Sequence, residues 1–322
     1  MSWSKYSGNP IFTDIDGYAV SVIKEGDYFY MFFQRDYNGK RAIWRAKSPN
    51  GLTDWVIDPN APVLQVGESG DWDDKLLHVP NVWKENGYYY MIYGGRHEAD
   101  NKSRACLARS TDMVNWEKWN GTGWGGSASP ILEPEYAWEN EGAGTEPWTL
   151  IKVGDTYYLW YNNLYLTNRK MGLATSTDLI NWSKDPNNPL FVDGRFCPCP
   201  YVENGKYILL VCHYTSGSDY SEIEIYEDVN PTFYPEDRVF KGIAWRYGDA
   251  GEWDSVDIDT PWVLTTDITR TSFPTSSIYA YYGGYDGTTI SAGLAIKPIP
   301  VEKKPTDIIY VGGFIKQGKV VV

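Results

Sequence analysis

Apolar and polar residues alternate along most of this chain with a period of two, which is the spacing of β-strands. Helical spacing of apolar residues is almost absent, and tyrosine, valine, isoleucine, phenylalanine and tryptophan dominate the alternating segments. One stretch predicts strands over residues 79–83, 88–93 and 105–110, with a hairpin turn at 84–87. A further turn at 111–116 leads into a short outer strand. Such a stretch is expected to form one small antiparallel sheet.

This succession of strands and turns recurs at intervals of about 60 residues. Gly26, Gly87, Gly154 and Gly205 each precede a strand that contains tyrosine. A second phrase, which runs from Ala and Ser to Trp, follows in three copies at 46–55, 108–116 and 174–182. A fixed repeat of this size indicates one structural unit that is copied, because each copy buries its apolar face only against its neighbours.

Four strands per unit is the pattern of a β-propeller blade, and 322 residues accommodate five such units. We therefore predict an all-β fold, a five-bladed β-propeller with four antiparallel strands per blade and a single domain over residues 1–322. The blades are expected at approximately 10–65, 66–132, 133–191, 192–245 and 246–297. The tail, residues 298–322, contains a short strand at 308–311 that we expect to close the ring or to pack beside it.

Composition limits the partners of such a fold. The formal net charge is −13, which argues against nucleic acids and anionic membranes as partners. No apolar run reaches the roughly 18 residues that cross a bilayer, and the N-terminus does not lead into a signal segment. A cytoplasmic or an already processed, secreted protein is expected. Aromatic residues make up 16% of the chain, and their flat faces suit both sheet packing and the binding of sugar rings.

Four cysteines, Cys106, Cys197, Cys199 and Cys212, match neither a zinc motif nor a disulfide framework, so we expect buried free thiols. No cofactor is expected. A structural calcium ion remains an open alternative, although the chain has no acidic loop of the D-x-D-x-D-G type.

The innermost strands of a propeller line a central channel, where side chains from distant parts of the chain can meet. Glu146 directly precedes Pro147 at the start of the third inner strand. An alignment on the proline places Tyr18, Val79, Cys197 and Thr260 at the matching positions of the other blades. A single glutamate in an aromatic channel is expected to have a raised pKa and to donate a proton near neutral pH.

Other acids and histidines lie close to the predicted inner strands. Asp16 leads straight into the first blade, and Asp259 lies beside the inner strand of the fifth. His78 stands next to the channel position of the second blade, and His213 follows a strand that is expected to end at the channel mouth. Each of these residues could equally have a structural role.

Several of these motifs together resemble the five-bladed propeller glycosidases, over roughly residues 3–297. The motifs are the opening segment 3–12, the Gly-x-Tyr-Tyr strands, the Ala-x-Ser-x-Asp to Trp turns, and Glu146-Pro147. That superfamily includes glycoside hydrolase family 43 and its relatives in families 32, 62, 68, 117 and 130. The Asn-Asp-Pro-Asn motif of family 32 is absent, which disfavours cleavage of fructans.

Family 43 implies an Asp base in blade one, a second Asp in blade two and a Glu acid before Pro in blade three. Only the acid carries over, to Glu146, because Tyr18 and Val79 stand at the other two positions. The resemblance leaves Asp16 as the candidate base and Asp259 or Asp74 as the third carboxylate.

The resulting hypothesis is an exo-acting, inverting glycoside hydrolase with a carbohydrate substrate. The expected sugar contacts are His78, Arg96, Trp148, Asn162, His213 and Arg35. Two alternatives stay open. A glycoside phosphorylase of the same fold would use Arg96 and His97 to bind phosphate, and a carbohydrate-binding propeller would lack catalysis altogether.

Overall fold

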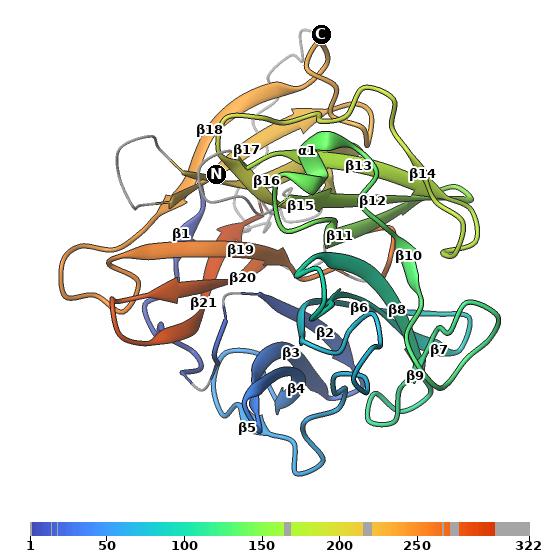
Figure 1. Ribbon diagram of the computed structural model, residues 1–322. Coiled ribbons are helices and arrows are strands. Elements are labelled where there is room, and N and C mark those ends of the chain that lie inside the picture. Colours follow the sequence, from blue (N-terminus) through green and yellow to red (C-terminus); the bar gives the residue numbers. More distant parts are fainter. Residues whose placement is uncertain are drawn as a thin grey trace, which may run out of the picture.

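The computed structural model describes residues 2–13, 15–17, 19–163, 169–214, 221–265, 267–270 and 277–299. Five antiparallel sheets are arranged in a ring around a common centre (Figure 1). Each innermost strand contacts the innermost strand of the next sheet, and the last contacts the first. The fold is therefore the predicted five-bladed β-propeller.

The sheets run from the centre outward in chain order. Blade one contains β2 (Val20–Glu25), β3 (Tyr28–Tyr37), β4 (Lys40–Ser48) and β5 (Val56–Ile57). Blade two contains β6 (Leu76–Glu85), β7 (Tyr88–Arg96) and β8 (Ser103–Ser110), and both β9 (Glu117–Lys118) and β10 (Pro130–Leu132) pair with β8. Blade three contains β11 (Glu146–Val153), β12 (Thr156–Asn162), β13 (Met171–Ser176) and β14 (Ser183–Lys184). A short helix, α1 (Ala137–Asn140), precedes it.

Blade four contains β15 (Arg195–Glu203), β16 (Lys206–Tyr214), β17 (Ser221–Asp228) and β18 (Val239–Arg246). Blade five contains β19 (Asp257–Val263), β20 (Ser277–Tyr285) and β21 (Ile290–Pro298). Its fourth strand is β1 (Ser4–Lys5), which comes from the other end of the chain and pairs with β21. The sequence did not indicate this closing strand, and the strand expected at 308–311 lies outside the described residues.

The two repeated phrases have the structures that their residues favour. Asn86 and Gly87 both have positive φ, at 49° and 83°, as the two-residue turn between β6 and β7 requires. In the second phrase, Oδ1 of Asp112 accepts hydrogen bonds from the backbone of Val114 and Asn115 at 2.8 Å. Asp178 binds Ile180 and Asn181 in the same way. These polar turns hold the outer edges of the blades.

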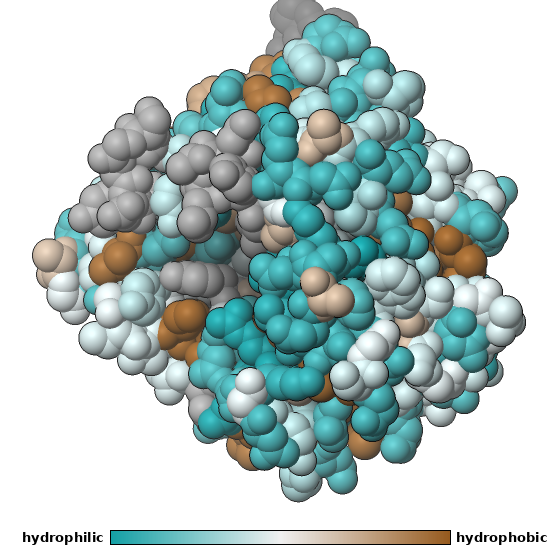
Figure 2. Space-filling model, in the orientation of Figure 1, coloured by the Kyte–Doolittle hydropathy of each residue, from teal (hydrophilic) through white to brown (hydrophobic). Residues whose placement is uncertain are grey.

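Apolar side chains pack between neighbouring blades. Trp3 next to β1 is 6% exposed, and its ring centroid lies 5.4 Å from that of Trp245 on β18. The face of the molecule in Figure 2 is mainly hydrophilic around the middle of the ring. In the part of the chain that the structure describes, no helix has the length and apolar character needed to cross a membrane.

Candidate active site

The inner strands of blades two to five share one irregularity that sets the geometry of the channel. In each strand three residue steps lie opposite two steps of the partner strand, so the inner strand has one extra residue. Such a β-bulge bends the strand and re-aims its side chains. Four residues at or next to the start of the bulge are equivalent by their register with the partner strand: His78, Glu146, Phe196 and Asp259.

This register corrects the sequence alignment on the prolines. Pro147 does not match Pro80, because it occupies the place of Val79, Cys197 and Thr260. Those three residues have positive φ of 47°, 53° and 55°, which a proline ring forbids. Pro147 thus shares their register but not their backbone conformation, and the register shift of β11 lies between Pro147 and Thr149. The alignment on the prolines was therefore wrong by one residue in blade three, and Asp259 is a second carboxylate at the level of Glu146. Tyr18 lies outside the described residues.

Both carboxylates line one pocket of about 200 Å³ at the centre of the ring. Blades one, two, three and five contribute to it, which brings together residues that are far apart in the sequence. Its lining is formed by Ala19, Gln34, Arg41, Leu76, His78, Val79, Arg96, Glu146, Trp148, Asp259 and Thr260. Besides Glu146, four of the residues expected from the sequence at the site line this pocket: His78, Arg96, Trp148 and Asp259.

Glu146 is completely buried at the first position of β11. Its Oε1 accepts a hydrogen bond from Nη2 of Arg96 at 3.0 Å and a longer one from Oγ of Ser103 at 3.4 Å. Its Oε2 has no hydrogen-bond partner. Burial raises the pKa of Glu146 to about 7, even though Arg96 favours the ionised form. Near neutral pH this carboxyl group can therefore both hold and release a proton.

His78 lies on the neighbouring strand and is uncharged near neutral pH. Its Nε2 lies 3.0 Å from Oγ of Ser103, and its Nδ1 lies 3.7 Å from Oε1 of Glu146. Burial and the positive charges of Arg96 and Arg41 hold the pKa of His78 well below its usual value. The imidazole thus supplies polar contacts without adding a charge beside Glu146.

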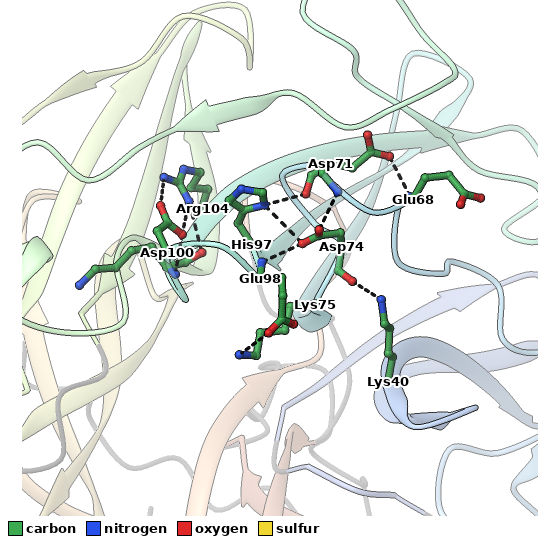
Figure 3. A network of polar contacts seen from close by, with 11 residues as sticks. Lys40, Glu68, Asp71, Asp74, Lys75, His97, Glu98, Asp100 and Arg104 are labelled. Atoms are coloured by element: carbon green, nitrogen blue, oxygen red, sulfur yellow. Dashed lines mark hydrogen bonds and ion pairs between the residues drawn. The ribbon is translucent and has the colours of Figure 1, made fainter.

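A polar network fixes the end of β7, the strand that carries Arg96 (Figure 3). Asp74 accepts hydrogen bonds from the backbone of Gly70 and Glu98, at 2.8 and 2.7 Å, and lies 3.3 Å from Nδ1 of His97. Burial would raise the pKa of Asp74, but these contacts outweigh it and the pKa is lowered. His97 is thus engaged with Asp74 and is not among the residues that line the pocket.

Asp259 is half-buried and belongs to a pair of acids on β19. Its Oδ1 accepts hydrogen bonds from Sγ of Cys212 at 3.2 Å and from the backbone of Thr260 at 2.6 Å. Burial raises the pKa of both Asp257 and Asp259, and repulsion from Asp259 contributes to the value of about 7 for Asp257. Oη of Tyr214 donates to Asp257 at 3.2 Å.

Sequence reasoning missed Arg169. Its guanidinium lies over the ring of Phe196 at 3.7 Å and over that of Tyr214 at 4.4 Å, and its buried Nη1 has no hydrogen-bond partner. Its positive charge acts to lower the pKa of both Glu146 and Asp259. Arg169 precedes β13 and belongs to neither repeated phrase, which left no sequence signal for it.

The structure places the remaining predicted residues elsewhere. Asp16 is exposed, accepts a hydrogen bond from the backbone of Asp36 at 2.7 Å, and lines a different pocket together with Tyr285. Arg35 stacks on Trp44, with 4.9 Å from its guanidinium to the ring centroid. None of these residues is part of the lining of the central pocket.

Two further predicted contacts also lie outside that lining. Nδ1 of His213 is 2.8 Å from Glu224, which Arg195 also binds. Asn162 is buried opposite Glu146, and its Oδ1 accepts a hydrogen bond from the backbone of Cys197 at 3.3 Å. All four cysteines are buried and free, as predicted.

Comparison with known proteins places this geometry in context. No family model matches the chain. The chain is 26% identical over 164 residues to a 1,2-β-oligomannan phosphorylase of Thermoanaerobacter sp. (strain X514), a match that covers 46% of this chain and 50% of the relative. It is 25% identical over 141 residues to an insoluble β-fructofuranosidase of Arabidopsis thaliana, covering 42% of this chain and 20% of the relative. The matches thus span half or less of the curated relatives.

Among solved structures, one comes from the GH130 family of mannoside phosphorylases, which contains glycoside hydrolases that target β-1,2-mannosidic linkages in Candida mannan. It superposes with a TM-score of 0.65 and 16% identity, over 92% of this chain and 95% of that chain. The chain has the five-bladed propeller fold of these glycoside hydrolases. In this propeller, Glu146 and Asp259 are the two carboxylates at equivalent positions of the described inner strands.

Proposed function

We propose that this protein cleaves glycosidic bonds, with Glu146 as the general acid and Asp259 as the second carboxylate. One observation carries the proposal: two acids at equivalent positions of different blades line one pocket, and one of them has a pKa of about 7. Glycoside hydrolysis uses such a pair, because one group must protonate the leaving oxygen while the other acts at the anomeric carbon.

The contacts of Glu146 suit the acid role. Arg96 and Ser103 bind Oε1, which leaves Oε2 free to carry the proton. As the bond between the anomeric carbon and the glycosidic oxygen breaks, this proton passes to the leaving oxygen. A water molecule adds to the anomeric carbon and gives its proton to Asp259, which accounts for an inverting reaction.

The size of the pocket supports action on a chain end. A volume of about 200 Å³ accommodates a single sugar ring better than the middle of a polysaccharide. Trp148 offers an aromatic surface beside this space. We therefore propose an exo-acting enzyme, and carbohydrate as its substrate class.

A second candidate function is phosphorolysis of a glycoside. Arg41 and Arg96 line the pocket, and Arg169, whose charge acts on both carboxylates, has a buried nitrogen without a partner. Guanidinium groups bind phosphate through paired hydrogen bonds, so these three residues could hold phosphate in place of the attacking water. These arginines support phosphate binding better than His97, which the sequence suggested for this role. His97 already contacts Asp74.

The two reactions are distinguished by assaying a panel of aryl glycosides and β-linked oligosaccharides with and without inorganic phosphate. Product formed without phosphate indicates hydrolysis, and product that depends on phosphate indicates phosphorolysis. Glu146→Gln is expected to lower kcat by about 10²–10⁴-fold in either case. The loss should be smaller for aryl glycosides whose leaving group needs no proton.

The control for this variant is Glu117→Gln, which changes a carboxylate that is 54% exposed on β9. It should keep full activity. Sugar binding without product from any substrate would overturn the enzymatic proposal and would leave a carbohydrate-binding propeller. Full activity of Glu146→Gln would overturn its assignment as the acid.

A further inference from the structure

Three potential metal ligands meet beside the pocket at the junction of blades four and five. Sγ of Cys197, Sγ of Cys212 and a carboxylate oxygen of Asp259 all lie within 4.8 Å of one another. Cys197 sits in the bulge of β15, Cys212 lies on the partner strand β16, and Asp259 lies on β19. The two thiols are fully buried, whereas Asp259 is half-buried and lines the central pocket.

We propose that Cys197, Cys212 and Asp259 bind a thiophilic divalent cation, with Zn²⁺ as the best match. Two sulfur ligands and one carboxylate are a donor set typical of zinc, and the pocket side of Asp259 leaves a fourth position for water. Tetrahedral Zn²⁺ holds such ligand atoms roughly 3.5–3.8 Å apart. Sγ of Cys212 already lies 3.2 Å from Oδ1 of Asp259, and all three ligand atoms lie within 4.8 Å of one another, so shifts of about 1 Å would bring them to these distances.

Charge balance supports a cation at this position. When the metal binds, each thiol loses its proton to the solvent, and the two thiolates and Asp259 then carry three negative charges. A divalent cation leaves one negative charge, and the positive charge of Arg169 acts on Asp259. The assembled site would therefore be close to neutral, which a buried location requires.

A second cluster of potential ligands in the described part of the chain has acids whose charge is already balanced by arginines. His213, Glu222 and Glu224 also lie within 4.8 Å of one another. Arg195 binds Glu224 at 2.7 Å, however, and Arg246 binds Glu222 at 2.9 Å. These acids already have cationic partners, whereas the buried thiols of Cys197 and Cys212 do not form ion pairs among the described contacts.

Metal binding at this cluster would also affect the proposed reaction. Asp259 cannot accept a proton from water while it coordinates a cation, so bound Zn²⁺ is expected to inhibit. This consequence rests on the proposed function, but binding itself does not. A direct binding measurement therefore separates failure of the metal site from failure of the proposed activity.

The test is titration of the full chain, kept reduced, with Co²⁺ as a spectroscopic substitute for Zn²⁺. One equivalent of Co²⁺ should produce the near-ultraviolet band of thiolate bound to cobalt, and Zn²⁺ should remove it by displacement. Cys212→Ser and Asp259→Asn should each weaken binding by at least ~10–100-fold. Cys106→Ser, which changes a buried thiol in blade two, is the matched control and should bind as the wild type does.

Absence of the thiolate band in the wild type would overturn the proposal. An undiminished band in Cys212→Ser, with the fold confirmed by circular dichroism, would place the metal elsewhere and would overturn it as well. If Cys212→Ser fails to fold, Asp259→Asn supplies the same comparison. Inhibition by Zn²⁺ that persists in Cys212→Ser would overturn this cluster as the source of the effect on activity.

Discussion

Nη2 of Arg96 lies 3.0 Å from Oε1 of Glu146, although the two residues belong to different blades. Arg96 ends β7 in blade two, and Glu146 begins β11 in blade three. The guanidinium stabilises the ionised carboxylate, while complete burial disfavours it, and the balance leaves the pKa of Glu146 at about 7. The contact between the blades thus sets the pH range in which Glu146 can donate a proton.

Activity is expected to fall as the pH rises through about 7, because Glu146 then loses the proton that it must donate. Arg96→Gln removes a cation that favours ionisation, so the alkaline limb of kcat should move to higher pH by roughly one unit. The measurement is kcat against pH for both proteins. Arg109→Gln, which changes an arginine paired with Glu117, should keep the wild-type profile. An alkaline limb that Arg96→Gln leaves in place would contradict this account.

Asp259→Asn and Asp16→Asn distinguish the two candidate bases. Asp259 lines the pocket of Glu146, whereas Asp16 is exposed in another pocket. Asp259→Asn should therefore lower kcat by about 10²-fold or more, and Asp16→Asn should stay within a few-fold of the wild type. Steady-state kinetics on one substrate decides between them. The reverse ranking would return the role of base to Asp16.

The same burial that raises the pKa of Glu146 should make the native state less stable at high pH. Between the ordinary glutamate pKa of 4.5 and the folded value of about 7, the folded protein binds the proton more tightly than the unfolded chain, so stability falls as pH rises through this window. Glu146→Gln avoids this loss. Its free energy of unfolding in urea should exceed that of the wild type by up to ~3 kcal/mol near pH 8 and by much less near pH 4.5. Equal pH dependence of both proteins would rule out this contribution.

Closure of the ring should depend on Trp3. It is 6% exposed and packs on Trp245, and the adjacent Lys5 lies 2.7 Å from the buried carboxylate of Asp254. Trp3→Ala is expected to destabilise the protein by about 3–5 kcal/mol, measured by urea unfolding. Phe240→Ala, which truncates a side chain 52% exposed on β18, should cost far less. Similar losses in both variants would mean that β1 contributes little to closure.

The repeated glycines and tyrosines were sufficient to predict the fold, because hairpin turns and alternating strands are local features. The position of the site depended on β-bulges, which local patterns do not reveal. Aligning Pro147 with Pro80 therefore matched Glu146 to Val79 instead of His78, and concealed that Asp259 occupies the equivalent place in blade five. Arg169 could not be predicted, since its contacts with the rings of Phe196 and Tyr214 arise only from tertiary packing.

The pairing of β1 with β21 joins two segments that the ribosome makes at very different times. Trp3 and Lys5 are synthesised well before their partner strand, which ends at Pro298. Until then, the four earlier blades can form only an open arc, whose first and last inner strands expose apolar surface to other molecules in the cell. Completion of the ring is therefore a late event, and this unfinished arc is the species on which chaperones are expected to act.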